Sequence, residues 1–476
     1  MNKKRTKIIA TISDRNCELE FVGKLYDAGM NVVRINSAHV TPEAAMEMIS
    51  NVRKVSNKIA ILLDTKGPEI RTTACDNPIS LKKGDIIQVI GNPEEKTSGN
   101  AIYVSYPKFS KDVPMDSHIL IDDGEIELKA IRKIGNAVEC SIENGGVLGS
   151  RKSVNVPGTR INLPSITERD KIFLKMAVES GIDFIAHSFV RSKQDILDVK
   201  AELSKYDSDI KIIAKIENQE GVDNFDDILE HVYGIMVARG DLAIEVPYER
   251  IPVIQKMIIN KCIISRKPVI VATQMLHSMI NNPRPTRAEV SDIANAIYSQ
   301  TDAIMLSGET ANGKYPVEAV LTMSKVAMEV EKNKEKFRNI PYVVEAAGNI
   351  SGYLAKVAVK TALRLNTKGI IADTAFGRTI RDMAAYRGFN LVLAQCYSQR
   401  TMRELALSYG VYADFQENSK SVDHFVQTAF KKLSKEYAIN DNDIFVLLSG
   451  NFKEGKGFSG VVVGSVDYLK SMVSLV

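Results

Sequence analysis

Charged side chains of both signs follow several short apolar runs of this sequence, where a strand would end and the chain would turn. Glu217 closes one such run and Asp241 closes the next, while Lys215 precedes Glu217 by two residues. Two carboxylates that converge on one rim suit a hard divalent cation such as Mg²⁺, because no His or Cys accompanies them. A fixed cation beside such a metal stabilises negative charge that develops on oxygen, as in phosphoryl transfer or enolate formation.

Other polar residues lie at the ends of neighbouring runs. Arg34 and Asn36 are two residues apart and therefore share one face of a strand. The turn "VARGD" offers the backbone N–H groups of Gly240 and Asp241 as an anion site at the start of a helix. A single charged residue in such a place is more often solvated or paired than catalytic, so the convergence of several carries the hypothesis. Weaker candidates are His39, Thr273 and Ser307.

His187 illustrates the alternative, a structural role in the core, because it lies inside an apolar run. A fully hydrogen-bonded core histidine is a better interpretation of it than a catalytic one.

The elements that must position these residues form a regular series of apolar, β-branched runs, most of them followed by a helix-length connection. Such runs are typical of parallel strands buried on both faces. Eight of them favour a (β/α)8 barrel over an open doubly wound sheet, and a barrel's active site forms at the carboxyl ends of its strands. The runs are "TKIIATIS", "NVVRINS", "IAILLDTKG", "DFIAHSF", "IKIIAKIEN", "YGIMVARGD", "KPVIVATQM" and "DAIMLSGET".

Two further regions accompany the barrel. Alternating runs and an Asp-Gly turn at Asp123 and Gly124 predict an inserted all-β domain, placed over the barrel rim as a lid. A charged helix, "EVEKNKEKFRN", follows the eighth run and leads to a small α/β domain. We expect the barrel in residues 1–71 and 158–345, the lid in residues 72–157 and the α/β domain in residues 346–476.

Composition disfavours several classes of protein. A net charge of +4, without a concentrated basic tail, is too mild to indicate binding to nucleic acid. No run approaches the roughly 18 apolar residues of a membrane span, and the first apolar run ends at Ile12, too early for a signal peptide. Five scattered cysteines predict reduced thiols, as in the cytoplasm.

The chemistry of the residues alone predicts a Mg²⁺-dependent enzyme acting on a small phosphorylated or carboxylated substrate. Phosphoryl transfer and enolate-forming aldolase or lyase chemistry both remain open at this point.

Several long motifs, in order along the chain, closely resemble the pyruvate kinase family. The resemblance covers nearly the whole chain, including the insertion and the C-terminal region. It implies a glycolytic phosphotransferase that transfers the phosphoryl group of phosphoenolpyruvate to ADP, giving ATP and an enolpyruvate that is protonated to pyruvate. It also implies Mg²⁺ or Mn²⁺, K⁺ and a cytoplasmic homotetramer. The motifs are "LLDTKGPEIR", "KIENQEGVDNFDDI", "VARGDLAIEVP", "ATQMLHSMINNPRPTRAEVSDIANAI" and "DAIMLSGETANGKYPVEAV".

The resemblance assigns roles to individual residues, motif by motif. It implies that Glu217 and Asp241 bind Mg²⁺, and that Lys215 stabilises the phosphoryl group during transfer. Arg34 would face that group, and Thr273 would belong to the route that delivers the proton. The implied substrate contacts are Lys215, Gly240, Asp241, Thr273 and Arg34, and the implied nucleotide contacts are Asn36, His39 and Arg71.

The resemblance also implies a potassium site, at which this chain departs from the family. Family members commonly read Arg-x-Asn-Phe-Ser-His-Gly, whereas this chain reads "RINSAHV", so Ala38 stands where a serine oxygen is expected. Glu69, by contrast, is typical of potassium-dependent members. We expect a retained but weaker dependence, with water or Ser37 supplying the lost oxygen. The remaining implied ligands are Asn36, Asp64 and the carbonyl of Thr65.

In the C-terminal region, "DTAFGRT" resembles the phosphate-binding loop of allosteric members. Phe376 occupies a position that often carries a hydroxyl group, and "SGNFKEGKGFSG" lacks the tryptophan and spacing of animal fructose-1,6-bisphosphate sites. The loop makes an anionic sugar phosphate or nucleotide a candidate effector, and the sequence specifies neither its identity nor its existence. The candidate residues are Thr374, Gly377, Arg378 and Thr379.

Two alternatives compete with this interpretation. One is a barrel lyase or aldolase that shares the enolate chemistry, against which the lid and the C-terminal domain argue. The other is a catalytically silent effector-binding protein, which would be expected to have lost Lys215, Glu217 or Asp241. All three residues are present.

Overall fold

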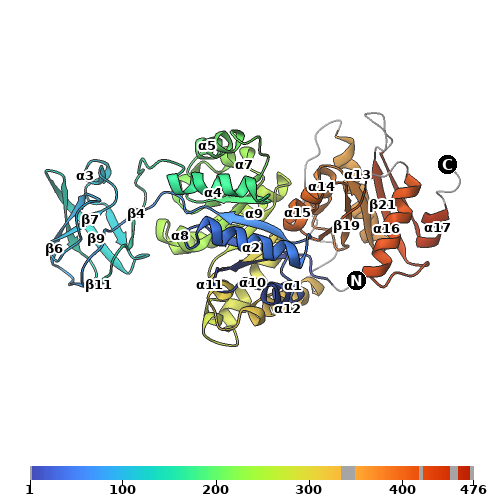
Figure 1. Cartoon of the computed structure of the whole chain (residues 1–476), viewed down its shortest axis with the longest axis horizontal. Helices are drawn as coiled ribbons and strands as arrows, with labels where there is room; N and C mark the ends of the chain where they lie inside the picture. Colours follow the sequence, from blue (N-terminus) through green and yellow to red (C-terminus); the bar gives the residue numbers. More distant parts are fainter. Residues whose placement is uncertain (1–2, 334–348, 418–421, 451–458, 472–476) are drawn as a thin grey trace.

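The computed structural model describes residues 3–333, 349–417, 422–450 and 459–471. The chain forms three parts in a row, with the barrel between an inserted β-rich region and a C-terminal α/β region (Figure 1). Most of the expected charged helix "EVEKNKEKFRN", the expected boundary between residues 345 and 346, and most of "SGNFKEGKGFSG" lie outside the described residues.

The central part is a closed barrel of eight parallel strands, in the order β1-β17-β16-β15-β14-β13-β3-β2. The predicted (β/α)8 barrel is therefore confirmed. Its strands are almost entirely buried, because helices cover the outside while side chains fill the inside. The strands are β1 Lys7–Ile12, β2 Val32–Asn36, β3 Ala60–Asp64, β13 Phe184–His187, β14 Lys211–Ile216, β15 Gly234–Ala238, β16 Val269–Ala272 and β17 Ala303–Leu306.

Alternation along the strands decides which side chains reach the barrel axis. Val32, Leu62 and Ile213 belong to the interior cluster, whereas Ile35 and Ile216 pack in the outer layer against the helices. Continuing the interior face along each strand leads to Arg34 and Asn36 on β2, Asp64 on β3 and Lys215 on β14. The polar residues at the strand ends thus extend the inner face of the barrel.

The barrel helices begin at local sequence signals. Thr41 caps one helix through its side chain, and capping boxes start two others at Thr167 with Asp170 and at Thr286 with Glu289. These three caps fix where the corresponding strand-to-helix loops end. The helices are α1 Leu19–Asp27, α2 Pro42–Val55, α4 Glu168–Glu179, α5 Lys193–Ser204, α6 Gln219–Asp223, α7 Phe225–His231, α8 Arg239–Glu245, η1 Tyr248–Arg250, α9 Ile251–Ile264, η2 His277–Ile280, α10 Arg287–Tyr298, α11 Gly308–Ala311 and α12 Pro316–Lys332.

The inserted region is a β domain with its own apolar core, and its main sheet has the order β4-β12-β8-β9-β10-β6-β7. The predicted Asp-Gly turn joins β8 to β9, with positive φ at Asp123 and Gly124. One short helix, α3 Phe109–Asp112, interrupts the β structure. The strands are β4 Ile70–Arg71, β5 Ile79–Leu81, β6 Ile86–Gly91, β7 Ala101–Val104, β8 His118–Ile121, β9 Ile126–Ile134, β10 Ala137–Ile142, β11 Gly146–Leu148 and β12 Ser153–Asn155.

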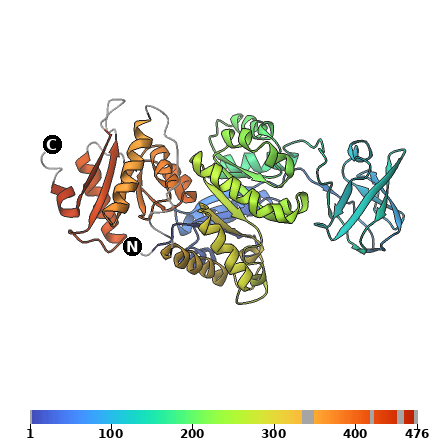
Figure 2. The same cartoon turned by 180° about the vertical axis from the view of Figure 1, so that it is seen from behind.

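The C-terminal region is a five-stranded sheet with helices on both faces, in the order β20-β19-β18-β21-β22 (Figures 1 and 2). Four of the strands coincide with the apolar runs that predict an α/β domain here, "GIIADT", "LVLAQC", "DIFVLLSG" and "GVVVGSV". The fifth, β20 Val411–Phe415, was not predicted, because this half-buried edge strand has no apolar run. The other elements are β18 Gly369–Thr374, β19 Val392–Cys396, β21 Ile444–Gly450, β22 Ser459–Ser465, α13 Ile350–Arg364, α14 Arg378–Ala385, α15 Gln399–Glu404, η3 Leu405–Leu407, α16 Val422–Glu436 and α17 Val466–Ser471.

The two outer regions contact opposite ends of the barrel. Leu407 of the C-terminal region packs into the interior cluster at the amino-terminal end of the strands. At the other end, Asn155 of β12 donates a hydrogen bond to Glu245 of α8 (3.0 Å). The strand ends that carry the candidate residues therefore face the inserted domain.

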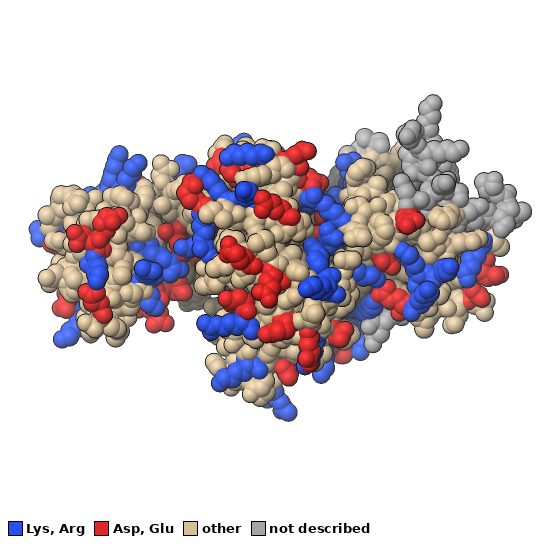
Figure 3. All heavy atoms as spheres, viewed as in Figure 1, with Lys and Arg blue, Asp and Glu red and all other residues tan. Residues whose placement is uncertain are grey.

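The surface carries both charges on all three regions, and Figure 3 shows Lys and Arg interspersed with Asp and Glu on the face in view. Within the described residues, no helix combines the length and the apolar character that crossing a membrane requires.

Candidate active site

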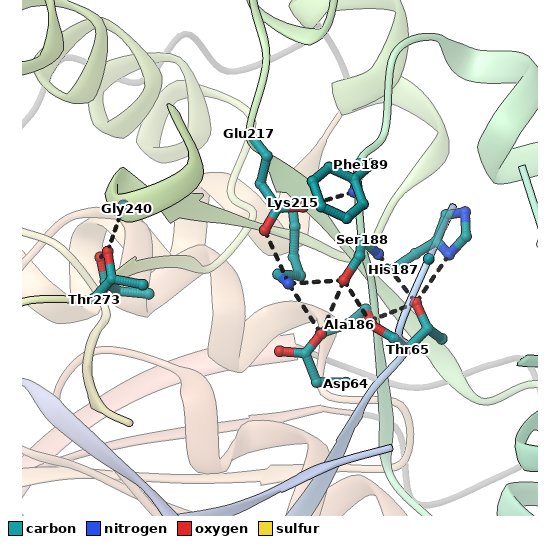
Figure 4. Close-up of polar contacts among 12 residues, drawn as sticks. Asp64, Thr65, Ala186, His187, Ser188, Phe189, Lys215, Glu217, Gly240 and Thr273 are labelled. Carbon is teal, nitrogen blue, oxygen red and sulfur yellow. Dashed lines mark hydrogen bonds and ion pairs between the residues drawn. The ribbon is translucent and has the colours of Figure 1, made fainter. Parts of the chain in front are cut away.

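The carboxyl end of the barrel holds a buried cluster of four charged side chains centred on Lys215, and Figure 4 shows Lys215 between Asp64 and Glu217. Its Nζ lies 2.9 Å from Glu217 Oε1 and 3.1 Å from Asp64 Oδ1. Arg34 Nη2 lies 2.6 Å from Asp64 Oδ2. Lys215 is 8% exposed, and the two carboxylates are 1% exposed. Two cations thus offset two carboxylates, which compensates for removing all four from water.

The cluster shifts the pKa values of its members. Burial alone would lower the pKa of Lys215, but the carboxylates of Asp64 and Glu217 raise it above its ordinary value. Burial raises the pKa of Glu217 to about 7, although Lys215 opposes this shift and the carboxylate of Asp241 adds to it. Lys215 is therefore a permanent positive charge at the centre of the site.

The chemistry of the donor set fits a divalent cation between Glu217 and Asp241. Their strands, β14 and β15, are neighbours, and the two carboxylates repel each other in the absence of a cation. Glu217 Oε2 accepts a hydrogen bond from the Phe189 N–H (2.6 Å), whereas the buried Oε1 faces the ammonium of Lys215 (2.9 Å). Mg²⁺ is commonly held by one or two carboxylates together with substrate oxygens. Among the described residues, no group of three or more His, Cys, Asp or Glu side chains forms a metal site.

Thr273, at the end of β16, lies next to this pair and has a strained backbone. Its φ is +73°, a region that a β-branched residue rarely enters. The Oγ1 atom accepts a hydrogen bond from the Gly240 N–H (2.7 Å) and donates to the Ala272 carbonyl (2.6 Å). The strain and these bonds place the hydroxyl against the start of α8, where Asp241 follows Gly240. Such outliers cluster at functional sites.

A second set of oxygen atoms lies between β2 and β3. Asn36 and Asp64 are register partners on these adjacent strands, and Thr65 follows Asp64 directly. Asn36 Oδ1 accepts a hydrogen bond from the Ala38 N–H (3.1 Å), so Ala38 lies beside this set, and its side chain supplies no oxygen. The buried Oγ of Ser37 has no hydrogen-bond partner among the described residues. Neutral and anionic oxygens of this kind suit a hard cation.

The sequence analysis did not identify Ser188, which connects the two sets of residues. Its Oγ lies 2.7 Å from Lys215 Nζ, 3.1 Å from Asp64 Oδ1 and 2.7 Å from the carbonyl oxygen of Thr65. Ser188 follows β13 directly and lies two residues after Ala186, which faces the barrel interior. The sequence does contain a signal for Ser188, because this residue directly follows the fourth predicted strand, and active-site residues of a barrel lie at such strand ends.

His187 is buried, as expected, with 1% of its surface exposed. Burial lowers the pKa of His187 to about 4. Its Nδ1 lies 3.3 Å from Thr65 Oγ1, but Nε2 has no hydrogen-bond partner among the described residues. The prediction of a fully hydrogen-bonded histidine is therefore wrong for one of its two nitrogens.

A cleft of about 660 Å³ lies between the inserted domain and the barrel rim. Arg71 and Asp241 line it from opposite sides. Arg71 Nε pairs with Glu69 (2.7 Å), and its Nη1 donates to the Arg151 carbonyl (2.8 Å). Burial raises the pKa of Glu245, which carries the contact to the inserted domain at the end of α8. His39 is exposed at the end of β2 and does not line this cleft.

The four candidate effector residues lie in the C-terminal region, away from the Lys215 cluster. The Gly377 N–H donates to Thr374 Oγ1 (2.8 Å), and Gly377 has a φ of +74°, which closes the loop before α14. Arg378 lines a cavity of about 820 Å³ together with Phe376. Thr379 follows in the first turn of α14.

Comparison with known proteins gives the family. A family model described as pyruvate kinase, barrel domain, matches residues 3–320, and one described as pyruvate kinase, alpha/beta domain, matches residues 353–462. Pyruvate kinase of Borreliella burgdorferi is 47% identical over 453 residues, which cover 95% of this chain and 94% of that protein. Pyruvate kinase of Geobacillus stearothermophilus is 42% identical over 463 residues, or 94% of this chain and 78% of that protein. The chain therefore belongs to the pyruvate kinase family of phosphotransferases.

Proposed function

We propose that this protein transfers the phosphoryl group of phosphoenolpyruvate to ADP at the carboxyl end of its barrel. The observation that carries the proposal is the buried Lys215 ammonium, held 2.9 Å from Glu217 beside Asp241. The bond between phosphorus and the enol oxygen breaks, and a terminal phosphate oxygen of ADP forms the new bond. The enolate that is left takes up a proton and becomes pyruvate.

Glu217 and Asp241 would hold Mg²⁺ or Mn²⁺, which when bound neutralises negative charge on the substrate oxygens. Lys215 and Arg34 provide fixed positive charge for the phosphoryl group as it moves between the two oxygens. Because their carboxylate partners already orient them, they need little rearrangement during the reaction.

The remaining roles follow the positions of the backbone groups around Thr273. The N–H groups of Gly240 and Asp241 would receive the substrate carboxylate, Gly240 giving up its bond to the Thr273 hydroxyl, which would lie on the route of the proton. On the nucleotide side we place Asn36, His39 and Arg71. The position of Arg71 in the cleft supports its role.

The inserted domain, residues 72–157, would act as the lid of this site, between barrel segments 1–71 and 158–345. The C-terminal domain, residues 346–476, would bind an anionic sugar phosphate or nucleotide through Thr374, Gly377, Arg378 and Thr379. A cytoplasmic homotetramer completes the proposal, and light scattering at a mass other than four chains would contradict that assembly.

The reaction is tested by mixing the protein with phosphoenolpyruvate, ADP and Mg²⁺ and measuring both pyruvate and ATP. We expect equal amounts of the two products, and none when ADP is omitted or Mg²⁺ is chelated. Pyruvate without a need for ADP would favour a lyase instead. No product in potassium or sodium buffers, with or without sugar phosphates and nucleotides, would favour a catalytically silent protein.

For K⁺ we propose ligands from Asn36, Asp64 and the Thr65 carbonyl, with one oxygen fewer because of Ala38. Ala38→Ser should then lower the K⁺ concentration for half-maximal activity roughly fivefold, if the added oxygen contributes about as much as one hydrogen bond. Ala38→Cys is the matched control, because sulfur is similar in size but a poor ligand for a hard cation. An unchanged potassium response in Ala38→Ser would mean that another group completes the site.

A further inference from the structure

His187 lies behind the Lys215 cluster, on the outer side of the barrel wall. In β13, Phe184 and Ala186 face the barrel interior, whereas Ile185 packs in the outer layer. Alternation places His187 on the same side as Ile185. Figure 4 shows the imidazole directed at Thr65 rather than into the cluster. His187 therefore does not touch the groups that react.

Thr65 is bonded to the end of β13 through three of its atoms. Its N–H donates to the Ala186 carbonyl (2.9 Å), and its carbonyl oxygen accepts from Ser188 Oγ (2.7 Å). Its Oγ1 accepts a hydrogen bond from the Ser188 N–H (3.1 Å). Ser188 Oγ in turn contacts Lys215 and Asp64. The orientation of Thr65 is thus linked to the orientation of Ser188 and of the central lysine.

The hydrogen-bonding capacity of the Thr65 hydroxyl indicates which nitrogen of His187 carries the proton. A hydroxyl donates once and accepts twice. Oγ1 lies 3.4 Å from the Ala186 carbonyl, to which it can donate, and Ser188 fills one acceptor position. A proton on Nδ1 of His187 fills the other. The opposite tautomer would bury an N–H group at Nε2 without a partner among the described residues, which is costly.

We infer that His187 is a positioning residue, which donates a hydrogen bond to the Thr65 hydroxyl and thereby holds the Thr65 carbonyl at the potassium site and Ser188 against Lys215. The inference rests on the proposed function, because the potassium site and the role of Lys215 belong to that proposal. The imidazole bonds the hydroxyl of Thr65, while the carbonyl of the same residue would bind potassium, so His187 acts through Thr65.

The test compares His187→Asn with His187→Leu. Asparagine can place an amide nitrogen near the position of Nδ1, whereas leucine fills the space without any donor. We expect His187→Leu to raise the K⁺ concentration for half-maximal activity roughly fivefold and to lower kcat, as loss of one hydrogen bond implies. His187→Asn should recover most of both. If His187→Leu matches the wild type, or if His187→Asn matches His187→Leu, the histidine serves only packing and the inference fails.

A second readout does not depend on turnover. Increasing KCl, at constant ionic strength maintained with NaCl, should raise the melting temperature of the substrate-free wild type, because a bound ion stabilises the folded state. In His187→Leu the same rise should need roughly fivefold more K⁺. Equal potassium dependence in the two proteins would contradict the inference, whereas a wild type that does not respond to K⁺ would contradict the proposed cation site and the inference with it.

Thr65→Val provides the remaining control, because it removes the hydroxyl and leaves the imidazole in place. If His187 acts through this hydroxyl, adding His187→Leu to Thr65→Val should change the potassium response far less than it does alone. Fully additive effects would mean that His187 acts by another route. Should His187→Leu fail to fold, an unchanged potassium response in Thr65→Val would by itself overturn the inference.

Discussion

Lys215→Met is expected to lower kcat for pyruvate formation by about 10³-fold or more. Removing a single oriented donor from an active site already costs about 10²–10³ in rate, and here the donor also carries the central charge. The substitution keeps the length of the side chain, so the walls of the site should remain in place. Steady-state rates at saturating phosphoenolpyruvate and ADP measure the loss. Full turnover in this variant would remove Lys215 from the mechanism.

The matched control is Lys211→Met, the same substitution on the same strand. Lys211 begins β14 at the opposite end of the barrel, where it is only partly buried and lies 3.6 Å from Glu404. We expect its kcat to remain within about twofold of the wild type, because a partly exposed ion pair contributes little. An equal loss in both variants would point to a general weakening of the strand.

The contacts of Lys215 in the structure also predict that Lys215→Met destabilises the fold, which the sequence alone does not indicate. Without the ammonium of Lys215, Glu217 loses its cationic partner and Asp64 keeps only Arg34. Breaking a buried pair in this way costs about 3–5 kcal/mol. The melting temperature of Lys215→Met should therefore fall, and Mg²⁺ should restore part of the loss by supplying positive charge between Glu217 and Asp241.

The barrel and most of its site follow from the sequence for a simple reason. Its strands are buried on both faces, so each is a continuous apolar run, and alternation then aligns Arg34 with Asn36 and Lys215 with Glu217. The edge strand β20 lacks such a run and was not predicted. Local pattern is sufficient where burial is complete or where apolar and polar residues alternate regularly, and it failed at β20, whose residues after Val411 are all only partly buried.

Contacts between distant segments could not be predicted in the same way. Ser188 meets Asp64 and Lys215 only because the barrel closes, and no spacing in the sequence indicates these distances. The positive φ of Thr273 accompanies a hydrogen bond that its hydroxyl accepts from the Gly240 N–H, which follows the end of another strand. The sequence therefore indicates which residues gather at the rim, while the bonds that orient them come from the closed fold.

Another contact between segments that are distant in the sequence joins the C-terminal region to the amino-terminal end of the barrel. Asp302, which precedes β17, is 3% exposed and pairs with both terminal nitrogens of Arg387 (2.8 and 2.6 Å). The carboxylate also accepts hydrogen bonds from the N–H groups of Tyr409 (2.9 Å) and Val269 (3.0 Å). Arg387 lies just beyond α14, so this ion pair connects two domains across their interface.

Arg387→Met should destabilise the protein by about 3–5 kcal/mol, because it leaves the Asp302 carboxylate buried without its cation. We expect the melting temperature to fall by roughly 5–10 °C. Lys58→Met is the control, since Lys58 also crosses this interface but pairs there with the partly exposed Asp414 (3.7 Å) and Glu436 (3.1 Å), and its loss should cost less than about 1 kcal/mol. Because the Lys215 cluster lies at the opposite end of the barrel, kcat of Arg387→Met well below its melting temperature should stay close to that of the wild type. A melting temperature equal to that of Lys58→Met would show that the buried pair adds no more stability than the partly exposed one, whereas a large loss of kcat at low temperature would mean that this interface also controls the site.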